Sequence, residues 1–262
     1  MHFLSKFRMV LTVFLALSVS FFFTGCFQVE QVIKVKPDGS GTIELSVVIT
    51  TEALAAMKEL SKDAPGGPKN PLDEMTSEEK GKEQAGNLGE GVTFVKTEKL
   101  KTAAGEGVKM IFSYTDVTKL KPNMDMQGGP GGGAKEPALT FDFTKGSPAT
   151  LVIKTVHEKG DKPAKPDEDP SDDEFKQASQ MMKGMKLTMA VEAVGAISET
   201  DAAHRTGNRV TLAEVPFDEI LKDKAKFKAM NKAGGWADAV KVLKEIPGVK
   251  VDPKETITIK FQ

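Results

Sequence analysis

The chain has 262 residues, and its 36 basic and 37 acidic side chains almost balance. Beyond residue 25, once Lys6 and Arg8 are set aside, 34 basic and 37 acidic groups remain, a net charge of −3. This balance argues against nucleic-acid binding by bulk electrostatics, and the single cysteine excludes a disulfide within the chain.

The first segment has the parts of a secretory signal. A basic start is followed by an apolar stretch over residues 9–23 and by the small residues Thr24 and Gly25. The stretch has about 15 residues, fewer than the roughly 20 that an α-helix needs to span a bilayer. We therefore predict that residues 1–25 are a cleaved signal peptide and that residues 26–262 form an extracytoplasmic domain.

Cys26 follows directly, and Thr24-Gly25-Cys26 resembles the lipobox of bacterial lipoproteins. The resemblance implies cleavage between Gly25 and Cys26 and acylation of the Cys26 thiol with palmitate-type chains, so that lipid holds the mature protein to a membrane. An ordinary signal peptide with an incidental cysteine and an uncleaved anchor helix are the alternatives, but a lone free thiol would be unusual in an oxidising compartment. Phe27 stands where an Asp would resemble an inner-membrane retention signal. This favours the outer membrane if the source is Gram-negative.

Two strands joined by a tight turn are predicted next. Residues 29–36 and 42–49 alternate between apolar and polar side chains, as half-buried strands do. The turn is Pro37-Asp38-Gly39-Ser40-Gly41, whose glycines supply positive φ. We expect the inward face of this hairpin to carry the apolar side chains Val29, Ile33, Val35, Ile43, Leu45, Val47 and Ile49.

The middle of the chain is predicted to alternate short elements with loops. Apolar spacing indicates a helix after Thr50 or Thr51, and Thr76 with Glu79 fits the capping box of a second helix that ends near Leu88. Alternating segments then predict four strands, at residues 92–102, 107–116, 139–143 and 150–156. Loops are expected at residues 64–72 and at the glycine-rich segment 121–137.

An acidic, proline-rich segment at residues 160–173 is the clearest internal break. Ser171 with Glu174 forms another capping box, and helical spacing follows it. The remaining pattern predicts strands at 187–196, 209–215 and 255–261 and helices at 217–230 and 236–243. Together the elements predict an α+β fold with a mainly antiparallel β-sheet and helices packed on it. Two small α+β subdomains that meet near residue 165 are the alternative.

The polar side chains offer no recognisable catalytic or metal-binding pattern. Neither His157 nor His204 has a second histidine at the spacing of a metal site. The acidic run at 167–174 and the segment 123–128 both lack the complete ligand spacing of a calcium-binding loop. No serine lies in the strand–turn–helix elbow that positions the nucleophile of many hydrolases. Acylation would consume the Cys26 thiol, so no free thiol would remain as a nucleophile. We therefore predict no catalytic residue, no metal and no cofactor.

Four methionines lie close together in the sequence: Met181, Met182, Met185 and Met189. Thioether side chains adapt to irregular apolar shapes, so these residues are candidates for lining a pliable pocket for an acyl chain. Ordinary packing in the hydrophobic core is the alternative, and it is the commoner use. Copper binding is disfavoured, because no histidine or cysteine accompanies the methionines.

Two stretches resemble the LppM-type lipoprotein domain of actinobacteria. The first is Cys26 followed by a strand, the turn Pro37-Asp38-Gly39-Ser40-Gly41 and a second strand. The second is Leu187-Thr188-Met189-Ala190-Val191-Glu192-Ala193-Val194-Gly195-Ala196-Ile197, followed by Gly207-Asn208-Arg209-Val210-Thr211-Leu212. The resemblance implies an α+β domain behind a lipidated cysteine, for which lipid or glycolipid binding has been proposed.

These observations predict a non-enzymatic lipoprotein of the cell envelope that binds an apolar or lipid-like ligand. Its expected partners are the membrane, through the N-terminal lipid, and a lipid ligand or an envelope protein, with no nucleic acid. A structural or protein-interaction lipoprotein without a small-molecule ligand is the alternative, with sheet edges or loops as contact surfaces. An enzyme whose carboxylates come together from distant parts of the chain is a third option.

Overall fold

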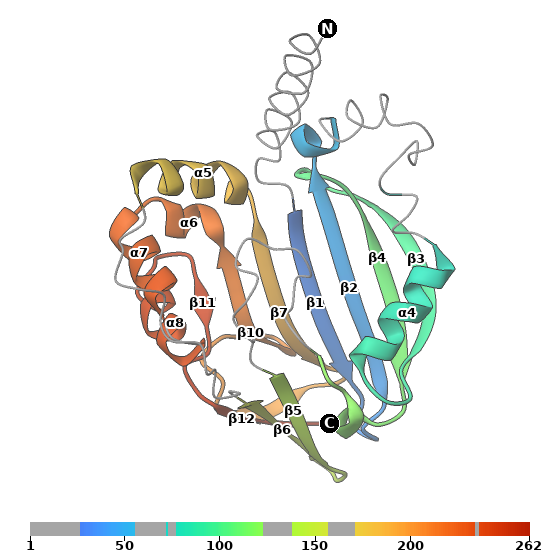
Figure 1. Cartoon of the computed structure of the whole chain (residues 1–262). Coiled ribbons are helices and arrows are strands. Elements are labelled where there is room, and N and C mark those ends of the chain that lie inside the picture. The colour runs from blue at the N-terminus through green and yellow to red at the C-terminus, as the bar shows by residue number, and fades with distance from the viewer. Residues whose placement is uncertain (1–26, 56–71, 73–76, 123–137, 157–170, 234–235) are drawn as a thin grey trace, which may run out of the picture.

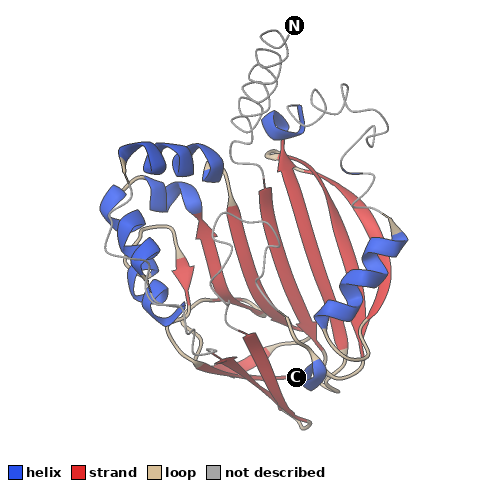
Figure 2. Cartoon of the chain, in the orientation of Figure 1, coloured by secondary structure: helices blue, strands red, loops and turns tan. Residues whose placement is uncertain are grey.

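The computed structural model describes residues 27–55, 72, 77–122, 138–156, 171–233 and 236–262. The described strands are β1 (Phe27–Val35), β2 (Gly41–Thr50), β3 (Thr93–Lys101), β4 (Gly105–Tyr114), β5 (Ala138–Thr144), β6 (Ala149–Val156), β7 (Lys186–Ala193), β8 (Ile197–Thr200), β9 (Arg205–Thr206), β10 (Arg209–Pro216), β11 (Lys250–Val251) and β12 (Thr256–Phe261). The described helices are α4 (Glu78–Leu88), α5 (Asp172–Met182), α6 (Phe217–Leu221), α7 (Lys224–Lys232), α8 (Trp236–Leu243) and the short 3₁₀ helix η1 (Val117–Lys119). Helices and strands occupy separate segments, which confirms the predicted α+β fold (Figures 1 and 2).

Two sheets organise the described part of the chain. The larger has eight strands, in the order β11-β10-β7-β1-β2-β4-β3 with β9 paired to β10, and the smaller has the order β5-β6-β12-β8. All described pairings are antiparallel except that of β1 with β7, which was not predicted. Both sheets combine strands from before and after residue 165, so the described strands do not separate into two subdomains there.

The predicted first hairpin forms where its turn residues place it. β1 and β2 pair from Phe27↔Ile49 to Val35↔Gly41. In the turn between them Gly39 has a φ of +87°, and the Asp38 carboxylate accepts hydrogen bonds from the backbone N–H and hydroxyl of Ser40. Local turn chemistry therefore fixes the register of this pair. The strands predicted at 139–143 and 150–156 are β5 and β6, which pair with each other in antiparallel fashion.

Two helix boundaries differ from the prediction. Ser77, and not Thr76, caps α4, because the Ser77 side chain accepts a hydrogen bond from a backbone N–H in the first helical turn. The helix predicted over residues 217–230 is divided into α6 and α7. The Asp223 carboxylate accepts hydrogen bonds from two backbone N–H groups and so begins a new helix there. Such side-chain caps compete with continuation of the preceding helix.

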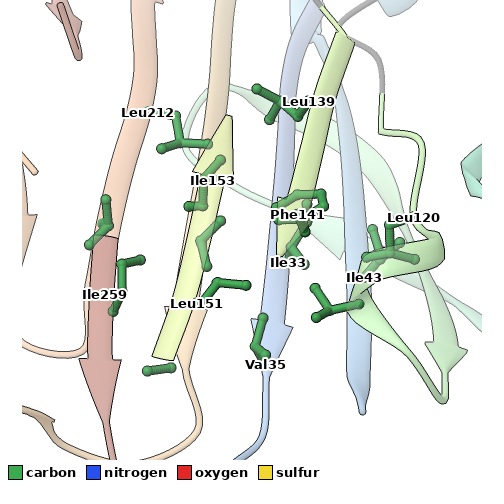
Figure 3. Close-up of a cluster of buried hydrophobic side chains, with 14 of the residues drawn as sticks. Ile33, Val35, Ile43, Leu120, Leu139, Phe141, Leu151, Ile153, Leu212 and Ile259 are labelled. Carbon is green, nitrogen blue, oxygen red and sulfur yellow. The ribbon is translucent and has the colours of Figure 1, made fainter. Parts of the chain in front are cut away.

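Three clusters of buried apolar side chains hold the described elements together. The first lies between the two sheets, where Ile33 of the larger sheet is close to Phe141 of the smaller, and it also contains Ile43 and Ile153 (Figure 3). The second packs α5–α8 against β10 and β11. The third joins the end of β2 to residues 53, 54 and 72. Burial of this apolar surface is the main favourable contribution to folding.

Candidate ligand-binding surface

The smaller sheet, α4 and α5–α8 all pack on one face of the larger sheet, which we call the inner face (Figure 1). Strand pairing shows which residues share this face, because directly opposed residues on neighbouring strands point the same way. Val191, Ile33, Ile43 and Phe112 lie opposite one another on β7, β1, β2 and β4. All four are buried in the first cluster, and we call them the covered row.

Further along the same strands the inner face is less covered. Val29 on β1 is opposed by Val47 on β2 and by Leu187 on β7, and Leu45 lies beside them on β2. These four side chains are half-buried. In the described part of the chain, Val29, Val47 and Leu187 belong to none of the three core clusters. We call Val29, Leu45, Val47 and Leu187 the apolar strip.

Gln31 lies on the inner face of β1, between Ile33 of the covered row and Val29 of the apolar strip. It is opposed by Leu45 on β2 and by Met189 on β7. The side chain is only 7% exposed, and its Nε2 has no hydrogen-bond partner among the described residues. A buried donor without a partner costs about 1–3 kcal/mol, so a group of this kind calls for a physical explanation.

A second concave region lies between α4 and the edge strand β3. It is a solvent-open hollow of about 390 Å³ lined by Glu78, Phe94, Val95, Lys96 and Thr97. Val95 sits at an irregularity in the pairing of β3 and is 52% exposed. Ligand pockets are mostly apolar and enclose most of the ligand surface. The open, charged hollow lacks these properties, and the apolar strip is the stronger candidate.

The structure does not bring the four candidate methionines together in one pocket. Met182 and Met185 are buried in the second cluster, Met189 is buried in the first, and Met181 is 43% exposed. Neighbours in a helix point about 100° apart, so α5 can turn Met182 toward the sheet only by turning Met181 away from it. Packing in the hydrophobic core, the alternative considered for these residues, accounts for the three buried methionines.

The predicted cleavage and lipidation site, Gly25 and Cys26, lies outside the described residues, as does His157. The described chain begins at Phe27, which is the first residue of β1. Within the described ranges, no helix has the length and apolar character needed to cross a membrane. Acylation of Cys26 therefore stays a prediction from the sequence.

His204 and Asp252 contact neighbouring loops of the fold. His204 Nε2 lies 3.3 Å from the carbonyl oxygen of Val251. The buried Asp252 carboxylate accepts hydrogen bonds from the backbone N–H groups of Ala203 and Lys254 and so joins two loops. Among the described residues, no three His, Cys, Asp or Glu side chains are grouped so that they could hold a metal ion.

The outer face of the larger sheet carries charged side chains. The Glu44 carboxylate lies 2.6 Å from Lys34 Nζ and 3.3 Å from Lys109 Nζ. Burial alone would raise the pKa of Glu44, but the hydrogen bond from Lys34 and the two positive charges together hold this pKa below its ordinary value. The charged side chains of the outer face and the apolar side chains of the inner face make the inner face the better candidate for an apolar ligand.

Sequence reasoning placed three of the four strip residues, Val29, Leu45 and Val47, on the inward face of the first hairpin, but it did not mark them as a site. The missed residue was Gln31. It occupies an inward position between Val29 and Ile33, where the alternation calls for an apolar side chain. A polar residue at an inward position of a strand was the available signal.

Comparisons with known proteins place few constraints on this chain. No protein-family profile and no curated protein sequence matches it. Among solved structures, it is similar to the folded domain of Mycobacterium tuberculosis LppM determined by NMR, with a TM-score of 0.31 and 10% sequence identity over 91% of this chain and 91% of that chain. A TM-score this low carries no argument about a shared fold or function. The α+β assignment therefore rests on the strands and helices described above.

Proposed function

We propose that the protein is a non-enzymatic, lipid-anchored protein of the bacterial cell envelope that holds an apolar or lipid-like ligand against the apolar strip. The half-buried strip on the inner face is the observation that carries the proposal. Apolar surface left in contact with water costs about 25 cal/mol per Å², and an apolar ligand that covers the strip would recover this free energy. Contiguous apolar patches of this kind mark interaction sites more often than scattered apolar residues do.

The lipobox-like sequence supports the location. Val29 follows Cys26 by three residues, so chain length alone keeps the start of the strip within about 11 Å of the anchor. Several acyl chains on one cysteine would give stable membrane attachment, which a single chain does not. The strip would then lie close to a bilayer surface, with the outer membrane expected in a Gram-negative cell.

Native mass spectrometry of the full-length protein, purified from bacterial membranes in mild detergent, tests both parts of the proposal. A mass that begins at Cys26 and includes acyl chains would support the anchor, and Cys26→Ser should remove the acyl mass. A further non-covalent mass that matches a lipid would support ligand binding. An acylated protein without any bound lipid would contradict the ligand-binding part alone.

Two matched variants locate the bound lipid. Val47→Gln places a polar amide in the apolar strip and should lower the occupancy of the lipid. Val152→Gln makes the same exchange at another half-buried strand valine, on β6 of the smaller sheet and away from the strip, and should leave the occupancy unchanged. Equal occupancy in both variants would place the ligand elsewhere.

Features of both edges of the larger sheet disfavour the alternative of strand-to-strand contact with a protein partner there. At one edge, β3 carries Lys96, Lys99 and Lys101 and has its pairing interrupted at Val95. At the other edge, β11 has only two residues. Lysines, bulges and short edge strands all hinder the addition of a further strand.

A further inference from the structure

We propose that Gln31 selects the chemical class of the ligand: a neutral acyl lipid whose ester or amide carbonyl accepts a hydrogen bond from Gln31 Nε2. The inference rests on the proposed ligand-binding function and deepens it, because it adds a polar requirement to an apolar site. It follows from the surroundings of Gln31 on the inner face.

The side chains in register with Gln31 offer no good hydrogen-bond acceptor for its Nε2. Its direct neighbours are Met189 and Leu45, and the next positions outward are Ala213 on β10 and Met110 on β4. A thioether is a weak acceptor, and the other side chains have no acceptor at all. With Nε2 buried and without a partner among the described residues, its acceptor is best supplied by a bound molecule.

Gln31 and the apolar strip are positioned to contact one molecule. Gln31 and Val29 lie two residues apart on β1, so their side chains point to the same face and their Cα atoms are about 6–7 Å apart. An acyl carbonyl that meets Gln31 would therefore allow its hydrocarbon chain to lie over Val29, Val47 and Leu187. A few well-placed polar groups in an otherwise apolar site commonly fix the orientation of a ligand.

The same surroundings favour a neutral carbonyl over a carboxylate. None of the side chains in register with Gln31 on β10, β7, β2 and β4 is charged. Lys99, on the inner face, belongs to the exposed edge strand β3 and is opposed by Val108, outside the row of Gln31. Burying a carboxylate without a cation costs much more free energy than burying a hydrogen-bonded ester carbonyl.

The test compares three probes on the full-length protein in maltoside micelles: methyl decanoate, dodecane and decanoate. Gln31→Leu removes the donor while keeping a similar side-chain size, and Gln31→Met serves as a second variant. Gln28→Leu is the matched control, because Gln28 is half-buried on the same strand but faces the other side of the sheet. The apparent Kd is obtained from the rise of the unfolding midpoint with probe concentration. Part of each probe dissolves in the micelles and lowers its free concentration. This affects variant and wild type equally, so it cancels in the ratio of their apparent Kd values.

We expect Gln31→Leu to weaken the binding of methyl decanoate about fivefold, the effect of one neutral hydrogen bond, and to leave the binding of dodecane unchanged or stronger. Gln28→Leu should change neither. Without any probe, Gln31→Leu should unfold at the same temperature as the wild type or at a higher one, because it removes a buried donor that has no partner.

The other outcomes separate this inference from the proposed function. If both neutral probes bind and Gln31→Leu weakens them equally or not at all, Gln31 makes no selective bond, and the proposed function stands. If decanoate binds more tightly than methyl decanoate and depends on Gln31, the ligand class is a fatty-acid anion and the neutral class is wrong. If none of the three probes binds the wild type, the proposed function itself fails.

Discussion

Two regions of the inner face are built from the same strands but differ in what covers them. In the covered row, Ile33 and Ile43 are fully buried, Ile33 beside Phe141 of the smaller sheet and Ile43 beside Leu120 (Figure 3). In the apolar strip, Val29 and Val47 on the same two strands are only half-buried. The alternation along each strand is the same in both regions, so tertiary packing and not the local pattern sets the difference. The covered row is therefore expected to serve stability and the strip to serve binding.

The largest effect is expected in the covered row. Phe112 is fully buried and meets the ring of Phe94 edge-to-face, with ring centroids 5.9 Å apart. Phe112→Ala should lower the free energy of unfolding by about 3–5 kcal/mol, because it removes apolar burial and leaves a cavity. Phe27→Ala, at a half-buried phenylalanine, should cost less than half as much. Urea denaturation followed by circular dichroism measures both, and equal losses would contradict the expectation that full burial in the covered row sets the cost.

The next effect separates core methionines from exposed ones. Met189→Ala would leave a cavity at a fully buried position and should cost about 2–4 kcal/mol of the free energy of unfolding. Met181→Ala, at an exposed position on α5, should change stability by no more than about 0.5 kcal/mol. A pocket lined by both methionines would instead give small and similar losses of stability. Thermal and urea unfolding of the two variants distinguish these outcomes.

A conservative pair of valine variants sharpens the comparison further. Val191→Ala in the covered row should lower the free energy of unfolding by about 2 kcal/mol, whereas Val47→Ala in the strip should lower it by about 1 kcal/mol or less. The binding of methyl decanoate should show the reverse order, with a weaker Kd for Val47→Ala and an unchanged Kd for Val191→Ala. A loss of stability for Val47→Ala as large as that for Val191→Ala would mean that the strip belongs to the core.

The sequence alone was sufficient to predict structure that depends on residues close together in the chain. The turn between β1 and β2 follows from glycines and an aspartate within five positions, and the Ser171–Glu174 capping box formed as predicted. The parallel pairing of β1 with β7 joins segments on either side of residue 165 and has no local signal. β8, β9 and β11 were missed because two to four residues are too few to show a period.

The candidate site was predictable only in part, for a physical reason. Alternation identified the inward positions of the first hairpin, but the cover above each position depends on elements far away in the chain. The unpaired state of Gln31 likewise depends on Met189, a residue of β7. Helical spacing grouped Met181 with Met182, although their different directions from the helix axis place one in solvent and one in the core.

The smallest effect concerns the charged outer face. The Glu214 carboxylate lies 2.7 Å from Lys186 Nζ and 3.0 Å from Lys250 Nζ. The hydrogen bond from Lys186, opposed in part by burial, holds the pKa of Glu214 below its ordinary value of 4.5. A carboxyl group with a lowered pKa stabilises the folded chain at pH values above its ordinary pKa, and the contribution disappears as the pH falls through the lowered value.

We expect Glu214→Gln to reduce the free energy of unfolding by at most about 1 kcal/mol near pH 7, and we expect this difference from the wild type to shrink in acid. Urea denaturation over a pH series measures this difference. Val47→Gln is the control: it changes no titrating group, so its loss of unfolding free energy should not follow the same pH dependence. If the loss caused by Glu214→Gln stayed constant down to acid pH, these ion pairs would not contribute to stability as proposed.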